Sequence, residues 1–251
     1  MAKQVGTFKI DGTIGDLTFY KSQGQHLVRQ KGGVSGDRIK NDPNFARTRE
    51  NNSEFGQAGT VGKGIRDAMR NLIDKAADSR VTSRLVQQLF SVIKSDTVNQ
   101  RGQRTVAGGN VSLLTGFEFN SRGKLSGTLF APMAYAIDRV GKNVSVTGDI
   151  NPINDLKVPA GATHYKLTNA ALVIDLTNLE TQELAMAATP ESAIDATIVP
   201  VALNASFAMD PTGKAIMQLV LIEFLQEVNG TFYSLRNGSF NALRVVGVDV
   251  V

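Results

Sequence analysis

The stretch of the sequence that comes closest to a ligand-binding motif is a glycine-rich run from Gly56 to Gly64, GQAGTVGKG. A phosphate-binding loop needs the pattern GxxxxGK[ST], in which backbone amides cradle phosphates and a hydroxyl binds magnesium. Here the glycine spacing is one residue too long, and Gly64 replaces the Ser or Thr. No strand-like segment precedes the run either. We therefore expect no nucleotide binding here and no cofactor.

Residues that commonly bind metals or act as nucleophiles form no recognisable set. The chain has no Cys, which excludes disulfides, thiolate metal sites and cysteine nucleophiles. His26 and His164 lie in separate strand-like segments, and their spacing indicates no third ligand. No Ser lies in a GxSxG pattern, and no close pair of carboxylates stands out. We expect no metal site, no catalytic residue and no enzyme, although carboxylates distant in sequence can converge in a fold and keep catalysis as a lesser alternative.

Basic residues are concentrated in the first half of the chain. Residues 1–125 carry 20 Lys and Arg against 11 Asp and Glu, whereas residues 126–251 carry 7 against 12. This asymmetry favours a bound polyanion or head-to-tail association of copies, with two ordinary solvated surfaces as the plainest interpretation. Nucleic acid is not favoured, because aromatic residues make up only 6% of the chain and no reading motif is present. The candidate phosphate contacts are Arg47, Arg49, Arg66, Arg70, Arg80, Arg84, Arg101 and Arg104.

Length and composition are those of a folded chain. The 251 residues suffice for one large domain or two smaller ones, and 42% of them are hydrophobic. No apolar run reaches the roughly 18 residues of a membrane span. The first residues lack the apolar region of a Sec signal peptide. We therefore expect synthesis in the cytoplasm without such a peptide, which is compatible with a virion or an extracellular assembly.

The rest of the chain is organised around a glycine-rich stretch, GTIGDLTFYKSQGQHLVRQKGG, at residues 12–33. Two β-prone runs, 17–20 and 26–29, flank a turn and predict a β-hairpin. A further strand is expected at 5–11, which gives a three-stranded sheet that is barely stable alone. Its exposed edge is suited to pairing with a neighbouring chain. The alternative is a local cap on the protein's own helices.

Two helices are expected next. Asp42-Pro43 is typical of a helix start, and apolar residues then recur every three or four positions up to Ala76. Four glycines in this segment each cost about 1 kcal/mol relative to Ala, so we expect a helix with a weak middle. A second helix, Arg80–Lys94, follows a short connection and predicts an antiparallel helix pair.

From residue 117 onward the pattern is β. Candidate strands lie at 117–120, 127–130, 143–149, 164–176, 193–208, 215–228, 231–236 and 243–250, with Asn229-Gly230 as the clearest hairpin turn. The predicted fold class is α+β, mainly β: a small N-terminal sheet, an antiparallel helix pair and an immunoglobulin-like or jelly-roll-like β-sandwich. The predicted domains are a glycine-rich β-hairpin arm (1–41), a helix pair (42–98), a linker (99–116) and the β-sandwich (117–251).

The N-terminal pattern also resembles a group of Bacteroidota proteins, chromosomal and phage-encoded. In that group a GxxGxxxxY hairpin ending in Val-Arg precedes an Asn-Pro or Asp-Pro turn, an Arg-rich helix and a C-terminal β-sandwich. The matching residues are Gly12, Gly15, Tyr20, Gly24, Val28, Arg29, Asp42, Pro43 and Arg47. The resemblance covers about the first 75 residues. It implies no established activity and is compatible with a virion or filament subunit.

Together these features favour a non-enzymatic structural subunit of a repeating assembly, a phage or phage-like virion component that self-associates through its N-terminal arm. Its partners would be further copies or neighbouring structural proteins. The alternatives are a Bacteroidota cell-surface filament or adhesive protein, and a basic nucleic-acid-associated protein. The candidate interface residues are Phe8, Ile10, Leu17, Phe19, Tyr20, Leu27, Val28, Arg29, Arg47, Arg66 and Arg70. The arginines among them are expected to face acidic patches such as Glu180, Glu183 and Glu191.

Overall fold

The structure is a computed structural model that describes residues 2–30, 32–235 and 240–250. The chain divides into two compact units, Met1–Arg49 and Glu50–Val251. Each unit is described by itself below. Strand accounts for 36% and helix for 26% of the chain, so the predicted α+β class with more strand than helix is confirmed. Among the described residues, no helix is long and apolar enough to cross a membrane.

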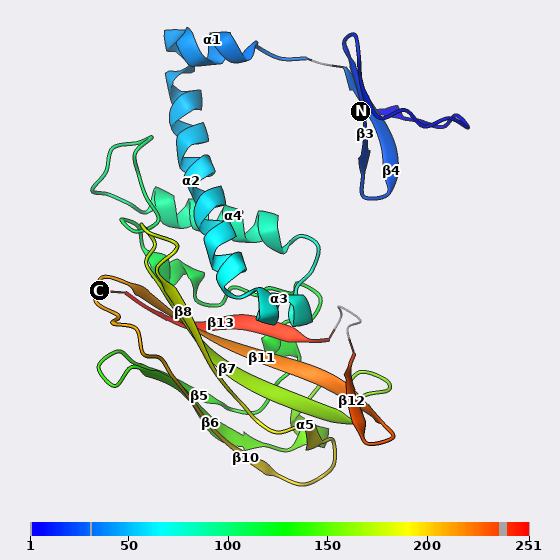
Figure 1. The fold of residues 1–251 in the computed structure, drawn as a ribbon, viewed down its shortest axis with the longest axis vertical. Helices are drawn as coiled ribbons and strands as arrows, with labels where there is room; N and C mark the ends of the chain where they lie inside the picture. Colours follow the sequence, from blue (N-terminus) through cyan, green and yellow to red (C-terminus); the bar gives the residue numbers. More distant parts are fainter. Residues whose placement is uncertain (1, 31, 236–239, 251) are drawn as a thin grey trace. The chain divides into compact units, whose positions relative to one another are not determined.

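The first unit contains a four-stranded antiparallel sheet with the order β1-β4-β3-β2, drawn in dark blue in Figure 1. Its strands are β1 (Ala2–Lys3), β2 (Gly12–Ile14), β3 (Leu17–Ser22) and β4 (Gln25–Gln30). The predicted strand at 5–11 is wrong, because this segment is a loop between β1 and β2. The helical part consists of α1 (Gly36–Asn41), η1 (Pro43–Phe45) and the start of α2 (Ala46–Ala68).

The predicted helix start is confirmed, with Asp42 as the N-cap residue and Pro43 as the first helical residue. The Asp42 carboxylate accepts a hydrogen bond from the Asn44 backbone N–H at 3.0 Å, and Pro43 opens the short helix η1 that leads into α2. The expected weak middle of the helix stays a prediction, because continuity of a helix does not measure its stability. α2 runs unbroken through all four glycines to Ala68, and Met69, with a φ of −116° and a ψ of 28°, separates it from α3 (Arg70–Ala76).

The predicted second helix is present as α4 (Val81–Lys94), which crosses α2 in Figure 1. The crossing helices approach each other at Gly62. A Cβ atom at that glycine would lie 3.2 Å from Leu89 Cδ1 and 3.5 Å from Val86 Cγ2 of α4. At Gly64, two residues further along the chain, a Cβ atom would lie 3.0 Å from Leu179 Cδ1. The glycines that weaken α2 as an isolated helix therefore let it lie close to its neighbours.

The unit Glu50–Val251 contains two antiparallel sheets. The larger has the order β12-β11-β7-β8, with β13 also paired to β11 and β9 paired to β7, and the smaller has the order β10-β6-β5. Three short helices, η2 (Val111–Leu114), η3 (Leu125–Gly127) and α5 (Pro152–Asp155), lie in the connections. The strands are β5 (Ala134–Asp138), β6 (Asn143–Ile150), β7 (His164–Ile174), β8 (Gln182–Ala188), β9 (Ser192–Ala193), β10 (Val199–Ser206), β11 (Ala215–Val228), β12 (Thr231–Ser234) and β13 (Ala242–Asp249).

Most of the strands of this unit agree with the predictions, and β11 does so at both ends. Asn229 and Gly230 have φ values of 53° and 77°, the geometry of a tight hairpin turn between β11 and β12. The strands predicted at 117–120 and 127–130 are wrong, since each contributes only one isolated bridge. The predicted strand 193–208 is divided between β9 and β10. Residue 236, the predicted end of the strand that begins at 231, lies outside the described residues.

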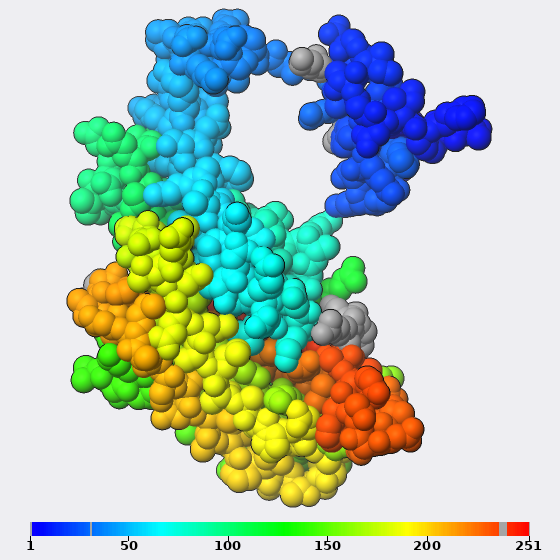
Figure 2. Space-filling view, viewed as in Figure 1, coloured from blue at the N-terminus to red at the C-terminus, as the bar shows by residue number. Residues whose placement is uncertain are grey.

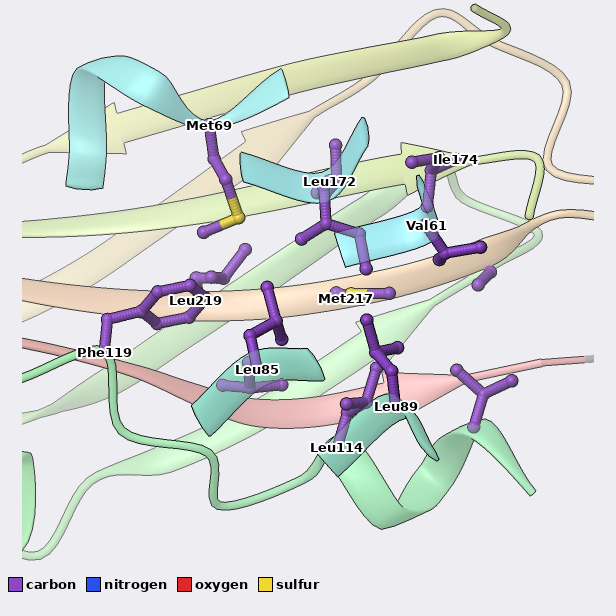
Figure 3. Close-up of a cluster of buried hydrophobic side chains, with 14 of the residues drawn as sticks. Val61, Met69, Leu85, Leu89, Leu114, Phe119, Leu172, Ile174, Met217 and Leu219 are labelled. Carbon is purple, nitrogen blue, oxygen red and sulfur yellow. The ribbon is translucent and has the colours of Figure 1, made fainter. Parts of the chain in front are cut away.

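Three layers stack in this unit: the helices, the large sheet and the small sheet (Figure 1). Met69, Leu85 and Leu89 of the helices pack on Met217 and Leu219 of β11, as Figure 3 shows. The opposite face of the large sheet packs on the small sheet, for example Val220 against Val146. In the space-filling view the helices, coloured cyan, lie directly on the yellow segment that includes β8 (Figure 2). β11 and the second half of β7 are therefore buried on both faces, which explains the apolar runs of β11 and of residues 170–174 in β7.

The segment 99–116, which the sequence predicts as a linker, folds against the helices. It contributes Val106, Val111 and Leu114 to the same hydrophobic core as α2 and α4. Arg104 donates two hydrogen bonds of 2.7 Å to the carboxylate of Glu54, whose residue is 1% exposed. The Arg104 guanidinium holds the pKa of Glu54 below its usual range.

Candidate assembly interface

Two tight turns build the N-terminal sheet. Gln23 and Gly24 have φ values of 50° and 78°, and they join β3 to β4 with Ser22 directly opposite Gln25. Positive φ at both central residues is the turn geometry that matches the twist of a β-hairpin. β2 and β3 are joined by a second two-residue turn, in which only Gly15 has a positive φ, of 56°, and Ile14 lies opposite Leu17. The predicted hairpin at residues 17–29 is therefore present, extended by one short strand on each side.

The pairing register divides the side chains of this sheet between two faces. We name one side the apolar face, which carries Ala2, Ile14, Leu17, Phe19 and Val28, with Lys21 and His26 opposite each other at one end and Gln30 opposite Leu17 at the other. We name the other side the basic face, which carries Lys3, Thr13, Thr18, Tyr20, Leu27 and Arg29. On the basic face the Arg29 guanidinium lies 5.6 Å from the centre of the Tyr20 ring.

The loop between β1 and β2 presents two apolar side chains to solvent. Val5 is 88% and Phe8 is 90% exposed within the unit. The Gln4 side-chain oxygen accepts the Ile10 backbone N–H at 2.9 Å, and Lys9 Nζ donates to the Gln4 carbonyl at 2.7 Å. These side-chain bonds give the loop a defined shape and replace the strand pairing that the sequence predicts for it.

None of the described residues of the first unit, 2–30 and 32–49, is buried. Ile14 remains 60% and Leu17 43% exposed, while Phe19 and Val28 are only partly covered. An apolar sheet face that stays open to water lacks the burial that normally stabilises a sheet. The sheet thus has an apolar face and, among its described residues, no core of its own.

The structure divides the residues predicted for the interface between both faces of the sheet, the β1–β2 loop and the helices. Leu17, Phe19 and Val28 share the apolar face, whereas Tyr20, Leu27 and Arg29 share the basic face. Phe8 and Ile10 lie in the β1–β2 loop. Arg47 lies at the start of α2, and Arg66 and Arg70 belong to the other unit. Sequence reasoning missed Val5 and Ile14, although the alternation of Ile14, Leu17 and Phe19 around a Gly-Asp turn pointed to Ile14.

Four of the arginines and acids assigned to charge pairing, Arg66, Arg70, Glu183 and Glu191, are engaged within the unit Glu50–Val251. Arg70 pairs with Asp67 at 3.1 Å, and Arg66 Nε donates to the Gly62 carbonyl. Glu183 accepts the Ala208 and Met209 backbone N–H groups at 2.9 and 2.6 Å. Glu191 pairs with Lys166 at 2.7 Å, and that ammonium holds the pKa of the carboxyl below its usual range.

A pocket of about 510 Å³ lies between α4 and residues 113–124. Arg84 at its wall donates to the Asp78 carboxylate at 2.8 Å and to the Phe119 carbonyl at 2.9 Å. Burial raises the pKa of Glu118, whose carboxylate accepts the Leu125 backbone N–H at 3.1 Å. These charged groups tie the 117–125 segment to the helix.

The two histidines lie in different units, and His164 Nε2 lies 3.8 Å from the Glu227 carboxylate. The His164 ring stacks edge-on against Phe232 with 4.8 Å between centroids, and His26 lies at the polar end of the apolar face. In the part of the chain that the structure describes, no group of three or more His, Cys, Asp or Glu residues is arranged to hold a metal ion.

Comparisons with known proteins add no family to these observations. No protein-family model, no curated protein and no solved structure matches the chain. The candidate site therefore rests on the geometry of the N-terminal sheet.

Proposed function

We propose that the protein is a non-enzymatic structural subunit of a repeating assembly, of a phage or phage-like particle, which associates with further copies through its N-terminal sheet. The observation that carries this proposal is the exposure of that sheet: none of the described residues among 2–49 is buried, although several are large and apolar. The resemblance of the first 75 residues to phage-encoded proteins supports the phage context.

The energetics of such a sheet favour a partner. Ordering a residue of backbone costs about 1–2 kcal/mol, and burial of apolar surface returns about 25 cal/mol per Å². Within its unit the sheet buries little, so its strand hydrogen bonds have little apolar burial to support them. A neighbouring surface that covers Ile14, Leu17 and Phe19 would supply the free energy of apolar burial that the sheet lacks.

A basic nucleic-acid-associated protein is the second candidate. Residues 1–49 contain nine Lys and Arg against four Asp and Glu, a charge that also suits a polyanion. Several arginines named above as phosphate contacts already bind groups of the protein itself. Arg49, for example, donates to the Ile39 and Asp42 carbonyls at 2.8 and 2.9 Å. We therefore favour self-association.

The mass of the purified chain, measured by light scattering across a concentration and salt series, tests the proposal. The control is a chain that lacks residues 1–41 and so retains η1 and α2. We expect oligomers of the full chain that grow with concentration and are absent from the truncated chain. A monomer at every concentration in both chains would contradict the proposal. Retention on DNA that falls steeply with salt would favour the nucleic-acid alternative.

A further inference from the structure

We infer that two copies of the chain pair through the apolar faces of their N-terminal sheets, stacked face to face about a two-fold axis. This inference rests on the proposed function and names the surface and the partner. Three observations carry it: the shortness of the sheet's edge strands, the distribution of charge between its two faces, and the state of the other sheets in the described chain.

The edges of the sheet are too short for strong pairing of strands between chains. β1 has two residues and β2 has three, whereas the central strands β3 and β4 have six each. Short edge strands are a common means of preventing edge-to-edge association. The extended surface of this sheet is its face, so contact through a face buries more than contact through an edge.

Charge separates the two faces. Lys3 and Arg29 lie on the basic face, where two copies would repel each other. On the apolar face, Ile14, Leu17, Phe19 and Val28 are uncharged, and its single lysine, Lys21, lies at one end beside His26. Gln30 lies at the other end, opposite Leu17. In a two-fold arrangement with antiparallel β3 strands, the Lys21 ends of the two copies lie far apart. The apolar face is thus the side that tolerates a second copy of itself.

The partner of an apolar sheet face is normally another apolar face. In the unit Glu50–Val251, the large sheet is covered by helices on one side and by the small sheet on the other. The inner face of the small sheet is covered in turn by the large one. Because these apolar faces are already occupied, a second copy of the N-terminal sheet is the matching surface. Two-fold pairing is also the commonest symmetry of homo-oligomers.

The expected contact is small. The four strands comprise 17 residues and, at about 4.8 Å between strands and a rise of about 3.3 Å per residue, they present a face of about 270 Å². Two such faces bury about 540 Å², well under the roughly 1,200 Å² below which complexes are weak and transient. Such a contact becomes durable when many are made at once in an assembly. We therefore expect a weak dimer in dilute solution.

Single cysteines test the inference, because the natural chain has none. Leu17→Cys and Phe19→Cys place a thiol on the apolar face of the full-length chain, and Thr18→Cys places one on the basic face between them. Stacked sheets lie about 10 Å apart, beyond the reach of a disulfide but within the reach of a bismaleimide of that length. At a concentration where oligomers form, we expect at least tenfold more bismaleimide-linked dimer from Leu17→Cys or Phe19→Cys than from Thr18→Cys.

The other outcomes distinguish failure of the face-to-face inference from failure of the proposed function. If the full chain assembles but Thr18→Cys cross-links as well as both apolar-face variants, the inference is wrong and the proposed function stands. Disulfide-linked dimers of Thr13→Cys, in the edge strand β2, would indicate edge pairing and would also overturn it. If light scattering finds only monomers of the wild-type chain, the proposed function fails and the inference fails with it.

Discussion

At the scale of single residues, Asp96 shows how one carboxylate organises a polar loop. It is buried and accepts hydrogen bonds from the backbone N–H groups of Val98, Asn99 and Thr105 at 2.9–3.0 Å. The Asn99 side-chain amide donates a fourth, at 2.8 Å. That amide, followed by the backbone donors, holds the pKa of Asp96 far below its usual range. The carboxylate thereby connects the end of α4 to the segment 99–116.

This network predicts a pH dependence of stability. Because folding lowers the pKa of Asp96, its contribution is complete above the unfolded pKa of about 3.9 and is lost as the pH falls below it. We expect Asp96→Asn to lower the free energy of unfolding by about 2 kcal/mol at pH 7, and by less at pH 3. Urea denaturation followed by circular dichroism at pH 7, 5 and 3 measures both values. Asp67→Asn, which breaks an exposed pair with Arg70, is the control. An Asp96→Asn loss as large at pH 3 as at pH 7 would show that the network acts through shape and not through charge.

At the scale of elements, α2 is held in place by tertiary contacts that its glycine-rich sequence does not reveal. Its glycines lower helix propensity, yet the helix is continuous because Ala58, Val61 and Ile65 are buried against the rest of its unit. The glycines differ in their surroundings. A Cβ at Gly59 would meet nothing within 4 Å, whereas one at Gly62 would press on Leu89 and Val86.

The two glycines therefore separate helix propensity from packing. Gly59→Ala should stabilise the chain by about 0.5–1 kcal/mol, since it adds helix propensity without a contact. Gly62→Ala carries the same propensity gain but crowds the Leu89 side chain, which lies 3.2 Å from the new Cβ, so the variant should be less stable than Gly59→Ala. Thermal and urea unfolding of both variants measure the difference. Equal stabilisation by the two changes would mean that the α2–α4 contact is loose.

At the scale of the whole molecule, the two units differ in what stabilises them. The unit Glu50–Val251 has a hydrophobic core on both sides of its large sheet, whereas none of the described residues in the unit Met1–Arg49 is buried. The second unit is thus stabilised by its own core, whereas the first unit presents an apolar surface that can associate with another chain. This division suits a subunit with a stable body and an arm whose order depends on its neighbours.

Removal of the arm should leave the body intact. A chain that lacks residues 1–41 should unfold at the same urea concentration as the full chain, to within about 0.5 kcal/mol, when both are dilute. In hydrogen exchange, the amides of β3 and β4 should exchange rapidly in dilute solution and become protected as oligomers form. Protection of these amides at every concentration would instead indicate that the arm is stabilised within a single chain.

The sequence by itself determined the local features of this protein. Alternating apolar residues, the Gln23-Gly24 and Asn229-Gly230 turns and the four-residue spacing of Val81, Leu85 and Leu89 act over short distances, so they predicted the hairpin, β11 and α4. It also predicted the mainly-β α+β class and most of the residues of the candidate interface. The sequence did not predict Val5 and Ile14 as interface residues, because their exposure depends on the conformation of the loop and of the short strands.

Only the tertiary structure decided which faces are covered. Burial depends on contacts between residues far apart in the chain, such as Met69 with Leu219 or Arg104 with Glu54. For the same reason β8, with the helix-like sequence QELAMAA, is a strand because β7 pairs with it. The apolar face of the N-terminal sheet followed from the register of β2, β3 and β4, which places Ile14, Leu17, Phe19 and Val28 on one side. Local pattern specified the strands, and long-range contact determined which of their faces are covered within each unit.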